Sequence, residues 1–129
     1  MANSVGYHEP LEALPEEVVD RHRVITSLQE ELEAVDWYDQ RVSATKNPEV
    51  AAILAHNRDE EKEHASMALE WLRRNDPMWE QHLRTYLFTS GPITGIEAAA
   101  EGEGASAGGG GGGRDGDSLG IGSLKGVEQ

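Results

Sequence analysis

Residues 50–71 read VAAILAHNRDEEKEHASMALEW, and polar residues interrupt the regular spacing of apolar residues in this stretch. Alternate steps of four and three residues lead to Val50, Leu54, Asn57, Glu61, His64, Ala68 and Trp71. Residues with this spacing form one face of an α-helix. Because Glu61 and His64 are three residues apart, a carboxylate and an imidazole lie about one turn from each other on that face. The two side chains can therefore reach one cation together.

The Glu61 and His64 pair occupies a face that helix packing would otherwise bury. Burying ionisable side chains without partners is strongly unfavourable, so a metal ion, a countercharge or water is needed to satisfy them. The alternative is a chance Glu-x-x-His pattern on the solvated face of an acidic helix. The spacing alone leaves both interpretations open.

The flanking sequence predicts an all-α chain built around an antiparallel two-helix hairpin. Pro15 and the two glutamates after it favour the start of a first helix, and apolar spacing from Val18 to Val42 extends it to roughly 30 residues. Asn47 and Pro48 form an N-cap and first turn for a second helix, which runs to about Arg74. The connection is short, so the two helices should pack antiparallel.

The first helix carries two apolar seams, which predicts two packing partners. One seam consists of Val18, Ile25, Leu28, Leu32, Val35 and Val42, and the other consists of Val24, Leu28, Glu31, Val35 and Tyr38. A third helix should start after the cap at Asp76-Pro77 and end at Ser90-Gly91-Pro92. It is too short to cover both long helices, so we expect two chains to associate into a four-helix bundle.

The composition limits the function classes. The 129 residues include 24 acidic and 11 basic ones, for a formal net charge of −13, which argues against nucleic acid or an anionic membrane as partner. The sequence contains no run of about 18 apolar residues, so it predicts no membrane span. The absence of cysteine excludes thiolate metal sites and fits a cytoplasmic location.

Four segments are predicted along the chain. Residues 1–13 form a polar leader whose order is doubtful, and residues 14–97 form the helical domain. Residues 98–116 contain the run Gly108–Gly113 and are expected to be a disordered, flexible linker. Apolar residues return in 117–129, a segment too short to fold alone, which favours a docking peptide. The alternative is a disordered tail with no partner.

A dinuclear carboxylate site in a four-helix bundle takes a glutamate from each of two helices and a Glu-x-x-His from each of the other two. This chain holds half of that set, with Glu31 in a seam of the first helix and Glu61 and His64 on the second. A two-fold dimer would supply the other half and place the metal ions between subunits. Oxygen-rich ligands with one imidazole per metal suit iron or manganese, and zinc stays open.

The residues around this set have two interpretations each. Glu30 and Glu33 make an acidic patch with Glu31, which is either a site at which cations enter or a solvated face. Trp37 is assigned to core packing, with electron transfer near a redox metal as the alternative. For Tyr38, packing and electron transfer both stay open. His22 and His56 are assigned to structural hydrogen bonds.

Four motifs together resemble the encapsulated ferritins. They are EELEAVDWY at 30–38, EEKEH at 60–64, RTYLFT at 84–89 and SLGIGSL at 118–124. The resemblance implies a dimer that rebuilds a ferritin-like di-iron site, with Glu31, Glu61 and His64 from both subunits as ligands, and a decameric ring of dimers. It implies metal entering near Glu30 and Glu33, and Trp37 and Tyr38 beside the centre.

The resemblance also implies the activity and the partner. The expected reaction is oxidation of Fe(II) to Fe(III) by dioxygen, with iron stored inside an encapsulin nanocompartment in the cytoplasm. Residues 117–129 would be the encapsulin-targeting peptide, anchored by Leu119, Ile121 and Leu124. The alternatives are a rubrerythrin-like peroxidase, a manganese enzyme, or a metal-binding cargo protein without catalysis.

Overall fold

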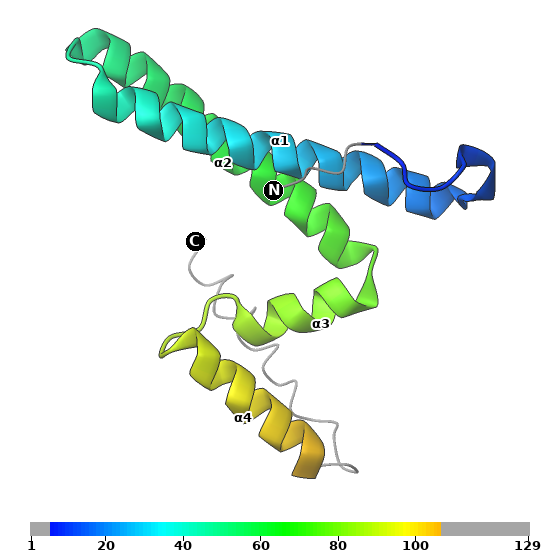
Figure 1. Cartoon of the computed structure of the whole chain (residues 1–129). Coiled ribbons are helices and arrows are strands. Elements are labelled where there is room, and N and C mark those ends of the chain that lie inside the picture. Colours follow the sequence, from blue (N-terminus) through cyan, green and yellow to red (C-terminus); the bar gives the residue numbers. More distant parts are fainter. Residues whose placement is uncertain (1–5, 107–129) are drawn as a thin grey trace. The chain divides into compact units, whose positions relative to one another are not determined.

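The computed structural model describes residues 6–106, and this part of the chain is helical and contains no strand (Figure 1). The elements are a 3-10 helix at Leu11–Ala13 and the α-helices α1 (Glu16–Ala44), α2 (Pro48–Arg74), α3 (Pro77–Tyr86) and α4 (Ile93–Ser106). The predicted all-α class is confirmed. The glycine run and the anchors Leu119, Ile121 and Leu124 lie outside the described residues. No helix within 6–106 has both the length and the apolar character that crossing a membrane requires.

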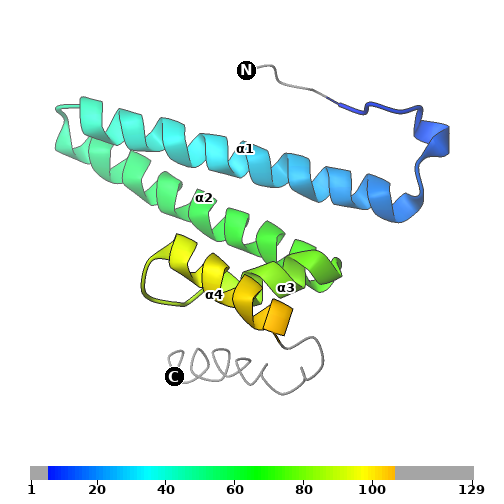
Figure 2. The ribbon, with the colours of Figure 1, turned by 60° about the horizontal axis from the view of Figure 1, so that its bottom comes forward.

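The chain divides into two compact units, of which the first ends at Asn75 and contains the hairpin of α1 and α2. The two helices run antiparallel and side by side along their length (Figures 1 and 2). The side chain of Asn47 accepts hydrogen bonds from the backbone N–H groups of Glu49 at 2.9 Å and Val50 at 3.1 Å, and Pro48 begins α2. The predicted cap, connection and hairpin are therefore confirmed.

The hairpin buries few side chains completely. Those that it buries are Val19, Ala65 and Leu72, with Leu72 fully inaccessible to solvent. The seam that contains Val24, Leu28, Glu31, Val35 and Tyr38 is half-buried. In contrast, Leu32 of the other seam is 55% exposed, and Ile25 is also exposed. The other residues of that second seam are half-buried, so only its positions at Ile25 and Leu32 are left exposed within the described chain.

Tyr7 of the leader contacts α1. The ring of Tyr7 lies against that of His22, with centroids 4.3 Å apart, and the 3-10 helix at Leu11–Ala13 precedes α1. Apolar spacing did not predict this contact, because an isolated aromatic residue in a polar stretch carries no periodic signal. His22 thus contacts the leader through its ring, and the hydrogen bond expected of it joins its Nε2 atom and the hydroxyl of Thr26 at 3.5 Å.

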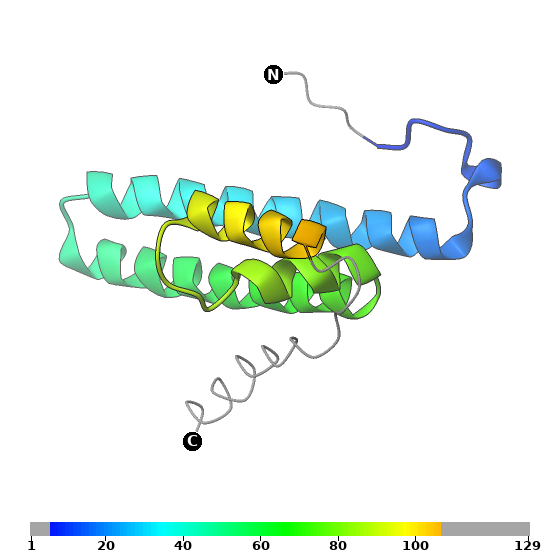
Figure 3. The ribbon, with the colours of Figure 1, turned by 90° about the horizontal axis from the view of Figure 1, so that it is seen from below.

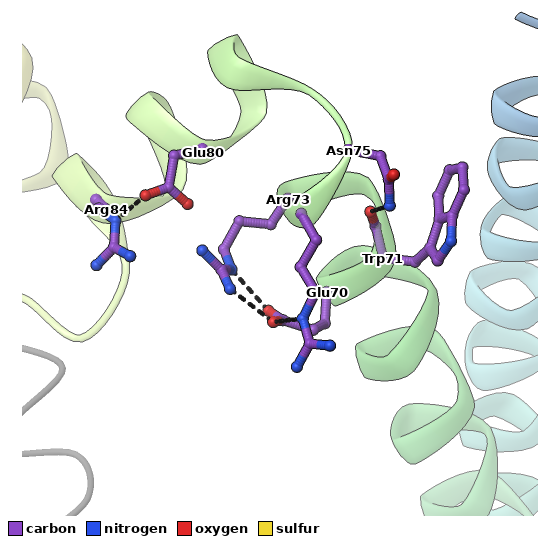
Figure 4. A network of polar contacts seen from close by, with 7 residues as sticks. Glu70, Trp71, Arg73, Asn75, Glu80 and Arg84 are labelled. Carbon is purple, nitrogen blue, oxygen red and sulfur yellow. Dashed lines mark hydrogen bonds and ion pairs between the residues drawn. The ribbon is translucent and has the colours of Figure 1, made fainter. Parts of the chain in front are cut away.

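An ion-pair cluster lies at the C-terminal end of α2 (Figure 4). The carboxylate of Glu70 accepts hydrogen bonds from Arg73 at 2.8 and 2.7 Å and from Arg74 at 2.6 Å. The side-chain amide of Asn75 donates to the carbonyl oxygen of Trp71 at 2.9 Å. The bonds from Arg73, and then those from Arg74, lower the pKa of Glu70 from 4.5 to about 2.

Glu70→Gln is expected to lower the free energy of unfolding at neutral pH by less than about 1 kcal/mol, because the ion pairs are partly exposed to solvent. The pKa of Glu70 is lower in the folded protein, so its contribution is present above pH 4.5 and is lost as the pH falls toward 2. Urea unfolding of both proteins across this pH range measures the difference. A deficit of the variant that stayed constant down to pH 2 would contradict the assignment.

The second unit begins at Asp76, whose side chain caps α3 by accepting from the backbone N–H groups of Met78 at 2.9 Å and Trp79 at 3.3 Å. Within α3, Arg84 pairs with Glu80 (Figure 4). The sequence did not predict α4, which contacts α3 and extends into the segment 98–116 that was assigned to the linker (Figure 3). The signal was present, because Pro92 precedes a run of alanines with high helix propensity.

Candidate metal centre

The hairpin brings Glu31 of α1 together with Glu61 and His64 of α2. Each side chain offers one ligand atom, and these atoms lie within 4.8 Å of one another. Nδ1 of His64 is 3.4 Å from Oε1 of Glu61 and 3.5 Å from Oε1 of Glu31. The pair on α2 is one turn apart along its helix, and the seam of α1 places Glu31 opposite it.

The cluster is partly enclosed and open on one side. The side chains of Glu31 and Glu61 are 25% and 24% exposed, whereas that of His64 is 43% exposed. The carboxylates are thus held between the helices while the imidazole still reaches the surface. This exposure leaves room for further ligands from solvent or from a second chain.

Glu61 changes the ionisation of Glu31. The pKa of Glu31 is raised, first because Glu61 shares a hydrogen bond with it, then because of burial and the negative charge of Glu61. Burial lowers the pKa of His64, but the hydrogen bond to Glu61 and the charge of Glu31 outweigh it, so the pKa is raised. The site therefore attracts positive charge, in this case a proton.

A cation that displaced this proton would relieve the repulsion between Glu31 and Glu61. Two carboxylates and one imidazole are ligands that iron, manganese and zinc all accept. The three residues from one chain leave such an ion with open coordination positions. The donor set therefore fits a divalent metal, and it fits a half-site better than a closed structural site.

Arg58 holds the two helices together one turn before Glu61. Its guanidinium donates to Asp39 on α1 at 3.0 Å and to Asp59 on its own helix at 3.1 Å. The side chain of Arg58 is 23% exposed, and that of Asp39 is 54% exposed. Sequence reasoning missed this positioning residue, because a single arginine in an acidic stretch has many carboxylates with which to pair.

The neighbouring residues lie outside the three-residue cluster. Glu30 and Glu33 are exposed on α1. Trp37 is also exposed and lines a surface hollow with Gln40 and Arg41, so the expectation that it packs in the core is not met within the described chain. Tyr38 is half-buried in the seam, and the guanidinium of Arg41 lies 5.4 Å from its ring centroid.

His56, the second histidine assigned to a structural role, lies away from the cluster. Its Nε2 atom is 3.7 Å from Glu60, one turn further along α2, and both side chains are well exposed. The same helix thus carries a solvated Glu and His pair and a partly enclosed one. Only the enclosed pair faces a carboxylate of α1.

Comparisons with known proteins agree with this architecture. The family model described as EncFtn-like matches residues 6–90. The encapsulated ferritin-like protein of Rhodospirillum rubrum is 69% identical over 127 residues, which cover 96% of this chain and 91% of the relative. The encapsulin nanocompartment cargo protein EncC of Myxococcus xanthus is 38% identical over 58 residues, 45% of either chain. The crystal structure of protein ne0167 from Nitrosomonas europaea has a TM-score of 0.67 and 62% identity, and covers 69% of this chain and 98% of its own.

Proposed function

Because the chain belongs to the EncFtn-like family, we propose that it is a ferroxidase that oxidises Fe(II) with dioxygen at a di-iron site shared between two subunits. The observation that carries this proposal is the convergence of Glu31, Glu61 and His64 within 4.8 Å. Iron is the substrate of this reaction, and two iron ions occupy each subunit pair. The test is the rate of Fe(II) oxidation in air by the full chain and by ligand variants.

The shared site follows from the incomplete ligand set of one chain. Three ligands cannot enclose two metal ions, whereas two copies related by a two-fold axis supply six. The exposed seam residues Leu32 and Ile25 offer apolar surface for such a contact. Burying this surface favours the dimer, which brings two clusters together. A ring of five such dimers is the proposed assembly, by resemblance to the encapsulated ferritins.

The roles of the ligands follow from their chemistry. Glu61 is assigned as the carboxylate that would bridge the two iron ions, and it lies 3.4 Å from Nδ1 of His64. The carboxylates stabilise the higher charge of Fe(III), and each imidazole completes the coordination of one ion. Glu30 and Glu33 are assigned to the entry of Fe(II). Trp37 and Tyr38 are assigned auxiliary roles beside the centre.

The proposed location is the interior of an encapsulin nanocompartment in the cytoplasm. Relatives that are named as encapsulated and as encapsulin nanocompartment cargo support it. Residues 117–129, with Leu119, Ile121 and Leu124 as anchors, are assigned to binding the shell protein. Iron oxidised at the shared site would then be stored within the shell.

Fe(II) is expected to promote association of the full chain, because a shared site exists only in the dimer. Ligand that binds only the assembled state shifts the equilibrium toward it by mass action. Sedimentation of dilute, metal-free protein before and after anaerobic addition of Fe(II) measures the shift. Mg²⁺ at the same concentration is the control, since it retains its waters and favours all-oxygen ligands. A dissociated population that Fe(II) leaves unchanged would rule out a shared site.

Deletion of residues 117–129 is expected to abolish co-purification with a co-expressed encapsulin shell protein. The apolar residues of this segment supply the contact, and the preceding glycine run supplies only reach. Replacement of Gly108–Gly113 by serines keeps the length of the chain and should retain co-purification. If the deleted protein were recovered with the shell at an undiminished level, the segment would not be the targeting peptide.

A further inference from the structure

Met67 lies three residues after His64 on α2, and its side chain is 58% exposed. Side chains three apart on a helix are neighbours, with Cβ atoms about 5–6 Å from each other. The thioether of Met67 is therefore adjacent to an imidazole of the candidate metal centre. Thioether sulfur is polarizable and is readily oxidised to the sulfoxide.

We propose that Met67 captures hydrogen peroxide formed at the metal centre and is converted to methionine sulfoxide. This inference rests on the proposed ferroxidase activity. Two Fe(II) ions give two electrons to one dioxygen, which takes up two protons to form one hydrogen peroxide and leaves two Fe(III). The peroxide then transfers one oxygen atom to the sulfur, so that its O–O bond breaks, an S=O bond forms and one water is released.

The position of Met67 along α2 favours capture at this residue. It is three residues from His64 and four residues before Trp71, so its position on α2 is next to those of a ligand and an oxidisable indole. Damage to an imidazole or an indole is not repaired, whereas methionine sulfoxide is reduced by dedicated reductases. A thioether at this position would react with the peroxide, and its sulfoxide can then be reduced back to methionine.

Met78 provides a comparison residue in the same chain. Its side chain is 54% exposed, close to the value for Met67, and it lies on α3, which carries none of the three ligands. Peroxide added to the solution reaches both methionines from solvent, so it gives the reference ratio of oxidation at the two residues. Peroxide that forms at the centre should favour Met67.

The experiment compares the two methionines within one digest of the full chain. Metal-free protein is loaded with Fe(II) without oxygen and then exposed to air, and a second sample receives only hydrogen peroxide. Trypsin cleaves after Lys62, Arg73, Arg74 and Arg84, which places Met67 and Met78 in different peptides. Fragment masses assign each added oxygen to methionine or to the tryptophan of the same peptide.

The expected result is a ratio of sulfoxide at Met67 to sulfoxide at Met78 that is several-fold higher during iron oxidation than with added peroxide. In Glu61→Ala, the ratio during exposure to iron and air should fall to that of added peroxide. If iron oxidation is accelerated but the ratio matches that of added peroxide, the capture by Met67 is overturned and the ferroxidase stands. If iron oxidation is no faster than in buffer, both proposals fall.

A second variant tests capture by another measurement. Met67→Leu conserves side-chain volume and leaves all three ligands in place, so its rate of iron oxidation should match that of the parent chain. It should release more hydrogen peroxide per Fe(II) in the first turnovers, as measured with a peroxidase-coupled dye. Met78→Leu is the matched control and should release the same amount as the parent. Equal release from both variants would overturn the inference.

Discussion

Glu61→Ala and His64→Ala should each lower the rate of Fe(II) oxidation to that of Fe(II) in buffer. Glu61 and His64 supply two of the three ligand atoms that the hairpin brings within 4.8 Å of one another. Because both subunits carry the substitution, each one removes two ligands from a shared site. The remaining groups cannot hold two iron ions at a distance that suits joint reduction of dioxygen. Stopped-flow absorbance of Fe(III) after mixing with aerated buffer measures the rate.

The solvated pair on the same helix provides matched controls. Glu60→Ala and His56→Ala remove the same side-chain types from an exposed position, and they should retain the parent rate. Glu61→Ala should also fold, because Glu61 is not among the buried residues of the hairpin. If a folded ligand variant kept the parent rate, the metal centre would be elsewhere.

The same measurements distinguish the alternative functions. A rubrerythrin-like peroxidase would consume added hydrogen peroxide faster than it oxidises Fe(II) in air. A manganese enzyme would show its activity with that metal and little with iron. A metal-binding cargo protein without catalysis would oxidise Fe(II) no faster than buffer, even with all ligands in place.

Leu72→Ala should lower the free energy of unfolding of the chain by about 2–5 kcal/mol. Leu72 is the largest fully buried side chain among residues 6–106, and the fully buried set of the hairpin is small. Loss of its methyl groups removes apolar burial and leaves a cavity that two helices can close only in part. Urea unfolding of metal-free protein at fixed chain concentration measures the change and keeps the contribution of association constant.

Leu11→Ala is the control for this substitution. It makes the same chemical change at a side chain that is 54% exposed in the 3-10 helix before α1, and it should change the free energy of unfolding by less than about 0.5 kcal/mol. Equal losses from the two variants would mean that the core of the hairpin does not lie at Leu72.

The helices of the first unit and the start of α3 were predictable because their signals are local. Asn47 and Asp76 cap the helices that follow them. A cap forms hydrogen bonds only with backbone N–H groups two or three residues further along the chain. The fourth helix was missed because its alanines and glycines carry no apolar periodicity, so composition suggested a linker. Propensity without periodicity is a weak signal, even where a helix forms.

The sequence by itself determined that Glu61 and His64 lie on one face of α2, because three-residue spacing on a helix allows no other arrangement. It also proposed Glu31 as their counterpart. Only the tertiary structure decided that the seam with Glu31 faces α2 while Ile25 and Leu32 of the other seam stay exposed. Both seams have a helical period, and the choice between them depends on the register and rotation of two packed helices. Contacts such as Arg58 with Asp39 depend on that register, because they join residues far apart in the chain.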